Sequence, residues 1–244
     1  MELGGSKSLG KHGFKINIRS NMSKYKYILF DLDGTITEPY LGISNGIKYA
    51  LNKFGIKMDD KETLRKFIGP PLRDSFRDFC GFSEEQAEEA TAYYREYYGV
   101  NGLEENEIMP GMDDALRLLY DKGYKLYLAT SKPEKYAKII LDNLGLLEYF
   151  DIAAGASFDG TRDKKELVIE YLLGQIKEKY DDFSIEQAIM VGDRHFDIHG
   201  AKYFDMDSIG VTFGYGDYKE LNNAGATYVV DEAMGIVDVV EITL

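Results

Sequence analysis

The chain has 244 residues, of which 44% are hydrophobic and 29% are charged, a composition ordinary for a globular protein with a sizeable core. Its formal net charge of −13 disfavours nucleic acid as a partner, because nucleic-acid phosphates would be repelled. The single cysteine, Cys80, allows no internal disulfide, and no apolar stretch approaches the length of a membrane span. We therefore expect a cytoplasmic protein without nucleic-acid or membrane partners, either a monomer or a homodimer.

Residues 1–23 differ in character from the rest of the chain. They are rich in Gly, Ser, Lys and Asn, show no helix or strand period, and lack the apolar core of a signal peptide. We predict that this segment is a disordered N-terminal extension. Met22 directly precedes the first predicted strand and is a candidate for the natural start.

The first predicted strand is the apolar run at residues 27–30, and Asp31-Leu32-Asp33-Gly34-Thr35 follows it directly. Carboxylates at positions i and i+2 leave a strand on the same side, here at its carboxyl end. Ligands bind at the carboxyl ends of strands in open α/β sheets. Two acids so close repel each other, so the simplest partner is a hard cation such as Mg²⁺.

The next part of the chain reads as helical, with predicted helices at residues 44–54, 61–67, 73–79 and 83–98. The last of these begins with a capping box, Ser83 with Gln86, and Gly99 follows as a predicted C-terminal stop. We predict an inserted α-helical cap domain at residues 39–109. The linkers near Glu38 and Pro110 would act as hinges.

Strands and helices alternate after residue 111. The predicted helices are residues 112–121, 133–144 and 166–180, and the predicted strands are residues 125–130, 151–154, 188–191, 208–211 and 227–230. This alternation predicts an α/β fold, a doubly wound parallel sheet with a Rossmann-like core. The core would comprise residues 24–38 and 110–244.

Two further predicted strands also end in polar groups, Thr130-Ser131-Lys132 and Gly192-Asp193. Between them, Arg162-Asp163-Lys164-Lys165 opens a predicted helix. Phosphoryl transfer needs a nucleophile, groups that hold and neutralise the phosphoryl oxygens, and an anchor for a metal ion. An Asp, a hydroxyl, a Lys and a further Asp at strand ends meet these needs.

These motifs, in this order, resemble the haloacid dehalogenase superfamily and its phosphatase branch. The resemblance covers the chain from about residue 24 to the C-terminus. It rests on Asp31 to Thr35, on Thr130, on a lysine that opens a helix, and on Gly192-Asp193-Arg194-His195-Phe196-Asp197. The segments at residues 68–72, 159–162 and 210–216 make the chain most similar to phosphoglycolate phosphatase-like and 5′-nucleotidase-like members with a helical cap.

The resemblance implies roles for the strand-end residues. Asp31 would attack phosphorus to form an aspartyl phosphate, and Asp33 would protonate the leaving oxygen and later activate water. Mg²⁺ would lie on Asp31, Asp193 and the carbonyl of Asp33. Thr130 and Lys165 would hold the phosphoryl oxygens.

Further residues carry supporting assignments. Gly34 and Ser131 would contact the substrate, and Asp197 would orient the lysine or a metal-bound water. Lys164 is the alternative to Lys165, because many relatives carry this lysine in a K-P-x-P pattern that is absent here.

The predicted cap offers candidates for substrate recognition. Arg73 could contact a substrate carboxylate or second phosphate, or it could form a surface ion pair. Helical spacing indicates that the four tyrosines near the end of the fourth predicted helix pack within the cap, although one could stack on a nucleobase. They are Tyr93, Tyr94, Tyr97 and Tyr98.

The favoured function is a Mg²⁺-dependent phosphomonoesterase for a small metabolite, of the phosphoglycolate or nucleoside 5′-monophosphate class. One alternative is a phosphomutase of the β-phosphoglucomutase type, which more often has Val at the position of Thr35. Another is a signalling receiver domain, which has no counterpart to the helical insertion.

Overall fold

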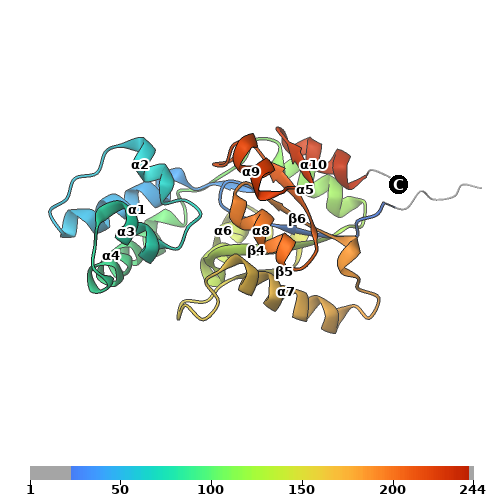
Figure 1. Cartoon of the computed structure of the whole chain (residues 1–244), viewed down its shortest axis with the longest axis horizontal. Coiled ribbons are helices and arrows are strands. Elements are labelled where there is room, and N and C mark those ends of the chain that lie inside the picture. The colour runs from blue at the N-terminus through green and yellow to red at the C-terminus, as the bar shows by residue number, and fades with distance from the viewer. Residues whose placement is uncertain (1–22, 242–244) are drawn as a thin grey trace, which may run out of the picture.

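The computed structural model describes residues 23–241 (Figure 1). The predicted N-terminal extension, including the candidate start Met22, lies outside the described residues except for Ser23. The described chain forms an α/β core and a separate group of helices, joined by two neighbouring segments (Figure 1).

The core is built on a six-stranded parallel sheet in the order β5-β4-β1-β6-β7-β8. Its first strand along the chain therefore lies at the centre of the sheet, and the predicted fold class is confirmed. The strands are β1 (Tyr27–Phe30), β4 (Lys125–Pro133), β5 (Phe150–Ala156), β6 (Ala188–Gly192), β7 (Asp207–Val211) and β8 (Tyr228–Val230).

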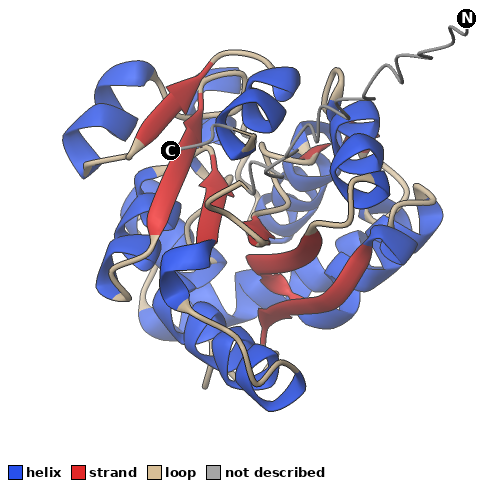
Figure 2. Cartoon of the chain, turned by 90° about the vertical axis from the view of Figure 1, so that its right-hand side faces the viewer, coloured by secondary structure: helices blue, strands red, loops and turns tan. Residues whose placement is uncertain are grey.

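Helices cover both faces of this sheet (Figure 2). Ile28 and Phe30 of β1 face the hydrophobic cluster formed with α5, α6 and α10, whereas Tyr27 and Leu29 face the cluster formed with α7 and α8. Because strand side chains alternate between faces, a short strand covered on both sides is apolar throughout. The helices are α5 (Met112–Asp121), α6 (Glu134–Asn143), α7 (Lys165–Lys179), α8 (His195–Tyr203), α9 (Tyr218–Ala224) and α10 (Ala233–Val240). Short 3₁₀ helices, η2 (Leu147–Tyr149) and η3 (Ile185–Gln187), lead into β5 and β6.

The group of helices at the left of Figure 1 is called the cap here. It comprises α1 (Tyr40–Lys53), α2 (Lys61–Lys66), α3 (Leu72–Cys80), α4 (Glu84–Tyr97) and the π-helical turn η1 (Tyr98–Gly102). Helix α4 packs against both α1 and α3. The chain enters and leaves the cap through β2 (Thr37–Glu38) and β3 (Glu107–Ile108), which pair antiparallel at the junction with the core.

The cap shows two differences from the predicted helices. Helix α1 begins at Tyr40, before the predicted residue 44, and includes Gly42, a poor helix former. A Cβ at Gly42 would lie only 2.6 Å from the Gly102 carbonyl oxygen, so close packing against η1 favours glycine. Gly99 does not end α4, because the helical path continues through η1. The capping box of Ser83 and Gln86 is present as predicted.

No helix within residues 23–241 is both long enough and apolar enough to cross a bilayer.

Substitution of a core residue of β1 tests this packing. Leu29 is completely buried, so we expect Leu29→Ala to lower the free energy of unfolding by about 2–5 kcal/mol, measured by chemical denaturation. Leu41→Ala is the matched control, because that side chain is 57% exposed and should cost little. Equal losses in the two variants would contradict the assigned arrangement of the core.

Candidate active site

The carboxyl end of β1 begins the site. The Asp31 amide donates to the Val191 carbonyl at 2.9 Å, which holds Asp31 against β6. The chain then turns at Gly34, whose φ of 84° favours glycine. A Cβ at Gly34 would also collide with the carboxylate of Asp193. This turn therefore brings the Asp31 and Asp193 segments into direct contact.

Lys165, the first residue of α7, reaches the same point. Its ammonium nitrogen lies 2.8 Å from Asp31 Oδ1 and 2.8 Å from Asp197 Oδ1, and it donates to the Ala129 carbonyl at 2.9 Å. Burial opposes its charge, but the Asp197 and Asp31 carboxylates outweigh that effect and raise the pKa of Lys165. Lys164, the alternative in the sequence, is exposed at the N-cap of α7.

Asp193 and Asp197 complete a cluster of buried carboxylates. Asp193 accepts hydrogen bonds from the Tyr215 amide at 2.8 Å and from the Thr35 hydroxyl at 3.2 Å. Asp197 accepts from the backbone amide that opens α8, at 3.0 Å. Burial, and then the neighbouring Asp197 and Asp31 carboxylates, raise the pKa of Asp193 well above its usual range. Burial raises the pKa of Asp197 to about 6, despite the opposing effect of Lys165.

This cluster has the donor set of a site for a hard cation. Oxygen atoms of Asp31, Asp193 and Asp197 all lie within 4.8 Å of one another and are shielded from solvent. Buried carboxylates at this spacing repel, and Lys165 supplies only one positive charge to them. A divalent cation with a preference for oxygen ligands would balance the remaining charge.

Lys132 is a site residue to which the sequence reasoning assigned no role. Its ammonium nitrogen lies 2.7 Å and 2.8 Å from the two oxygens of Asp33, and both side chains are largely buried. Burial raises the pKa of Asp33, although Lys132 opposes that rise. Strand β4 continues through Lys132, past the predicted end at Thr130. Thr130 and Lys132 are two positions apart on β4, and this spacing was a signal that their side chains share one side of the strand.

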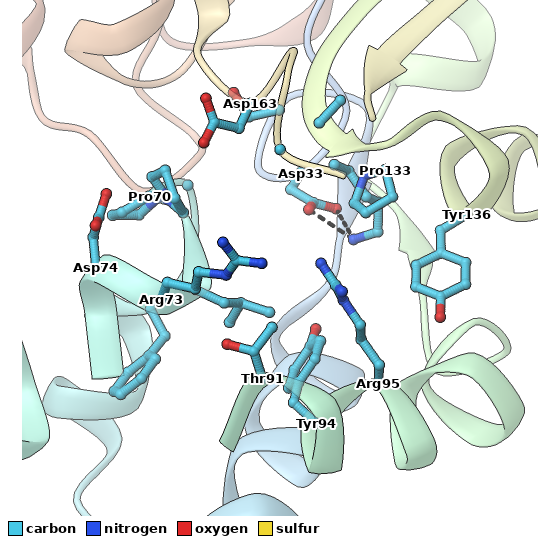
Figure 3. Close-up of a pocket in the computed structure, with 18 of the residues that line it drawn as sticks. Asp33, Pro70, Arg73, Asp74, Thr91, Tyr94, Arg95, Pro133, Tyr136 and Asp163 are labelled. Carbon is cyan, nitrogen blue, oxygen red and sulfur yellow. Dashed lines mark hydrogen bonds and ion pairs between the residues drawn. The ribbon is translucent and has the colours of Figure 1, made fainter. Parts of the chain in front are cut away.

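A cavity of about 310 Å³ lies between the core and the cap (Figure 3). From the core it is lined by the predicted site residues Asp31, Asp33, Thr130 and Ser131. Lys165, Asp193 and Asp197 do not line it and lie behind Asp31. The cavity thus meets the carboxylate cluster at Asp31.

Aromatic side chains of the cap close one side of the cavity. Tyr94 and Tyr98 are stacked with ring centroids 5.1 Å apart and are almost completely buried, in line with the predicted packing role. The ring of Tyr98 also lies 4.8 Å from the ammonium nitrogen of Lys132 and 5.9 Å from the Tyr136 ring of the core. These contacts connect the cap to the ion pair at Asp33.

Two arginines of the cap extend into the cavity (Figure 3). Arg73, the predicted substrate contact, also forms an ion pair with Glu88, with a hydrogen bond of 3.0 Å. Arg95 of α4 was not singled out from the sequence, and its guanidinium lies 5.4 Å from the ring centre of Phe158 in the core. Its position on α4, one helical turn before Tyr98 of η1, was the available signal.

The surrounding loops fasten the cap over the site. Arg194 follows Asp193 in the core and donates to the carbonyl of Ile68 in the cap at 3.1 Å. The same guanidinium pairs with Glu220 at 2.9 Å. A ligand in the cavity would therefore be enclosed by groups from both units.

Comparison with known proteins agrees with this arrangement. The family model for "Haloacid dehalogenase-like hydrolase" matches residues 28–211. The chain is 37% identical to a 5′-nucleotidase of Pseudomonas aeruginosa, over 92% of this chain and 99% of that protein. It is 34% identical to the tyrosine-protein kinase PtkA of Mycobacterium tuberculosis, over 84% of this chain and 68% of that protein.

Among solved structures, a predicted phosphatase from Clostridium acetobutylicum superposes with a TM-score of 0.82 at 43% identity, covering 88% of this chain and all of that one. This extent of similarity excludes a receiver domain. The chain is a phosphatase and belongs to the haloacid dehalogenase-like hydrolases.

Proposed function

We propose that the protein is a Mg²⁺-dependent phosphomonoesterase that hydrolyses a small phosphorylated metabolite through an aspartyl phosphate on Asp31. The main support for this proposal is the position of Asp31, which lines the cavity, contacts Lys165 and belongs to the carboxylate cluster. The substrate would be of the phosphoglycolate or nucleoside 5′-monophosphate class.

Asp31 and Asp33 would share the chemical work. A carboxylate oxygen of Asp31 bonds to phosphorus as the bond to the leaving oxygen breaks, which divides one difficult displacement into two steps. Asp33 gives its proton to the leaving oxygen, then takes one from the water that hydrolyses the aspartyl phosphate. The raised pKa of Asp33 suits the first transfer, and its contacts with Lys132 fix its direction.

The remaining residues would hold the phosphoryl group. Lys165 and Thr130 would bind its oxygens, with Asp197 orienting Lys165 through their 2.8 Å contact. Gly34 and Ser131 would offer backbone and hydroxyl contacts. Closure of the cap would exclude water.

Mg²⁺ would be held by Asp31, Asp193 and the backbone carbonyl of Asp33. When bound, it would neutralise charge on the phosphoryl oxygens. The fit rests on the buried oxygen donors and on the raised pKa of Asp193.

Phosphate release from a panel of esters tests the function. The panel includes 2-phosphoglycolate, nucleoside 5′-monophosphates, sugar phosphates, phosphotyrosine and p-nitrophenyl phosphate. We expect release with Mg²⁺ and none with EDTA. Asp31→Asn should lower kcat at least about a thousandfold because the nucleophile is lost. Unchanged turnover in Asp31→Asn would rule out the aspartyl phosphate, and isomer formation without free phosphate would favour a phosphomutase.

The role of Asp33 separates binding from turnover. We expect Asp33→Asn to lower kcat by about 10²–10⁴-fold, because the amide can neither donate nor accept the required proton. KM should change far less, since the groups that hold phosphate remain. Steady-state kinetics with p-nitrophenyl phosphate measures both, and a normal kcat would exclude Asp33 as the acid and base.

Thermal unfolding with and without Mg²⁺ tests the metal site independently of activity. We expect metal-free Asp193→Asn to unfold at a higher temperature than the metal-free wild type, because the amide removes a buried negative charge. Mg²⁺ should stabilise the wild type more than the variant, since a ligand stabilises only a state that binds it. Calorimetry with EDTA or Mg²⁺ measures both effects.

Asp142→Asn is the matched control, because Asp142 is exposed on α6 and its substitution removes one negative charge, as Asp193→Asn does. It should keep the response of the wild type to Mg²⁺. A full Mg²⁺ response in Asp193→Asn would remove this residue from the metal site.

A further inference from the structure

We propose that Arg95 determines specificity by binding an oxyanion, a carboxylate or second phosphate, on the leaving group of the substrate. This inference rests on the proposed phosphatase function and names its substrate class. The substrate would be a phosphomonoester whose leaving group carries another negative charge.

The other cationic side chains near the cavity already have carboxylate partners. Lys132 pairs with Asp33, and Lys165 pairs with Asp31 and Asp197. Arg73, which the sequence suggested for this role, pairs with Glu88. Within residues 23–241, Arg95 has no ion-pair partner, although it is half-buried and lines the cavity.

An oxyanion would supply what Arg95 lacks. Partial burial removes water from a guanidinium, and a hydrogen-bonded anion compensates for that loss. The planar fork of an arginine matches two oxygens of a carboxylate or phosphate. In a protein with a net charge of −13, an anionic leaving group also needs local positive charge.

The direction of Arg95 assigns it to the leaving-group part of the cavity. Its side chain extends from α4 toward Asp33 (Figure 3), the residue proposed to protonate the leaving oxygen. Phe158 of the core lies beside the guanidinium, with 5.4 Å from its ring centre to the central carbon. This contact restricts Arg95 to the cavity wall where the cap meets the core.

The two cap tyrosines that line the cavity, Tyr94 and Tyr98, offer less to a neutral nucleobase. A base stacks on an exposed ring face, but Tyr94 and Tyr98 are only 5% and 1% exposed and stack on each other. The accessible charge of Arg95 is therefore the stronger basis for recognition. A preference of the enzyme for nucleoside monophosphates is the alternative result that the test below can give.

Matched esters measure the effect of the second charge. Each acid is paired with its alcohol analogue: 2-phosphoglycolate with 2-hydroxyethyl phosphate, and 3-phosphoglycerate with glycerol 1-phosphate. Ethylene glycol bisphosphate distinguishes a second phosphate from a carboxylate. For each pair we compare kcat/KM for the acidic ester with kcat/KM for its alcohol analogue. We expect this ratio to fall about 10- to 100-fold in Arg95→Met. The fall should come mainly from KM, and Arg95→Lys should restore part of it.

Arg117→Met is the control for loss of one arginine, because Arg117 is exposed on α5 and pairs with Asp114. It should keep the wild-type ratio. The proposal is overturned if Arg95→Met changes the ratio by less than about threefold, or if Arg73→Met lowers it instead. A wild type that prefers nucleoside monophosphates, with the same preference in Arg95→Met, would also overturn it.

Binding separates this proposal from the proposed function. If the wild type hydrolyses none of the esters, the proposed function fails for these substrates. Calorimetric titration can still compare the binding affinity for 2-phosphoglycolate with that for 2-hydroxyethyl phosphate. Loss of the preference for the acid in Arg95→Met, with part of it kept in Arg95→Lys, supports the anion site. No preference for the acid in the wild type excludes it.

Discussion

The buried ammonium of Lys165 is the interaction on which the site depends. It contacts Asp31 at the end of β1 and Asp197 in α8, at 2.8 Å each. Without it, the cluster with Asp193 would place three carboxylates together in a medium that penalises isolated charge. Its single charge leaves the cluster short of positive charge, which is why a divalent cation fits the site.

The sheet order explains how distant parts of the chain meet there. Strand β1 lies between β4 and β6, so the groups at their carboxyl ends converge on one edge. Helix α7 starts at the same edge and contributes Lys165 from its first residue. Small residues allow this approach: a Cβ at Gly192 would collide with the Asp197 carboxylate. The core thereby positions the groups proposed for phosphoryl transfer.

The cap adds groups of a different kind. It leaves and rejoins the core through the paired strands β2 and β3, and it contributes Arg95 and Tyr98 to the cavity wall. Tyr98 contacts Lys132, which in turn contacts Asp33. The group proposed to recognise the leaving group and the contacts that place the proposed acid are therefore adjacent, although they come from separate units of the fold.

The sequence by itself determined the fold class and the acids at the strand ends, because both depend on local patterns. Helix α5 has the predicted bounds, and Asp31 and Asp33 follow the central strand as their spacing required. Local patterns could not decide between Lys164 and Lys165, since both open the same helix. Only the tertiary structure shows that Lys165 meets Asp31, because that contact depends on how α7 packs against the end of β1.

The same limit applies to the side chains across the cavity. Lys132 and Asp33 are 99 residues apart in the chain, and their ion pair follows from the pairing of β1 with β4. Arg73 and Arg95 both lie on cap helices, but Glu88 engages the first and leaves the second without an ion-pair partner among the described residues. Periodicity reports which face of an element is buried, whereas the partner that a charged side chain meets is set by long-range packing.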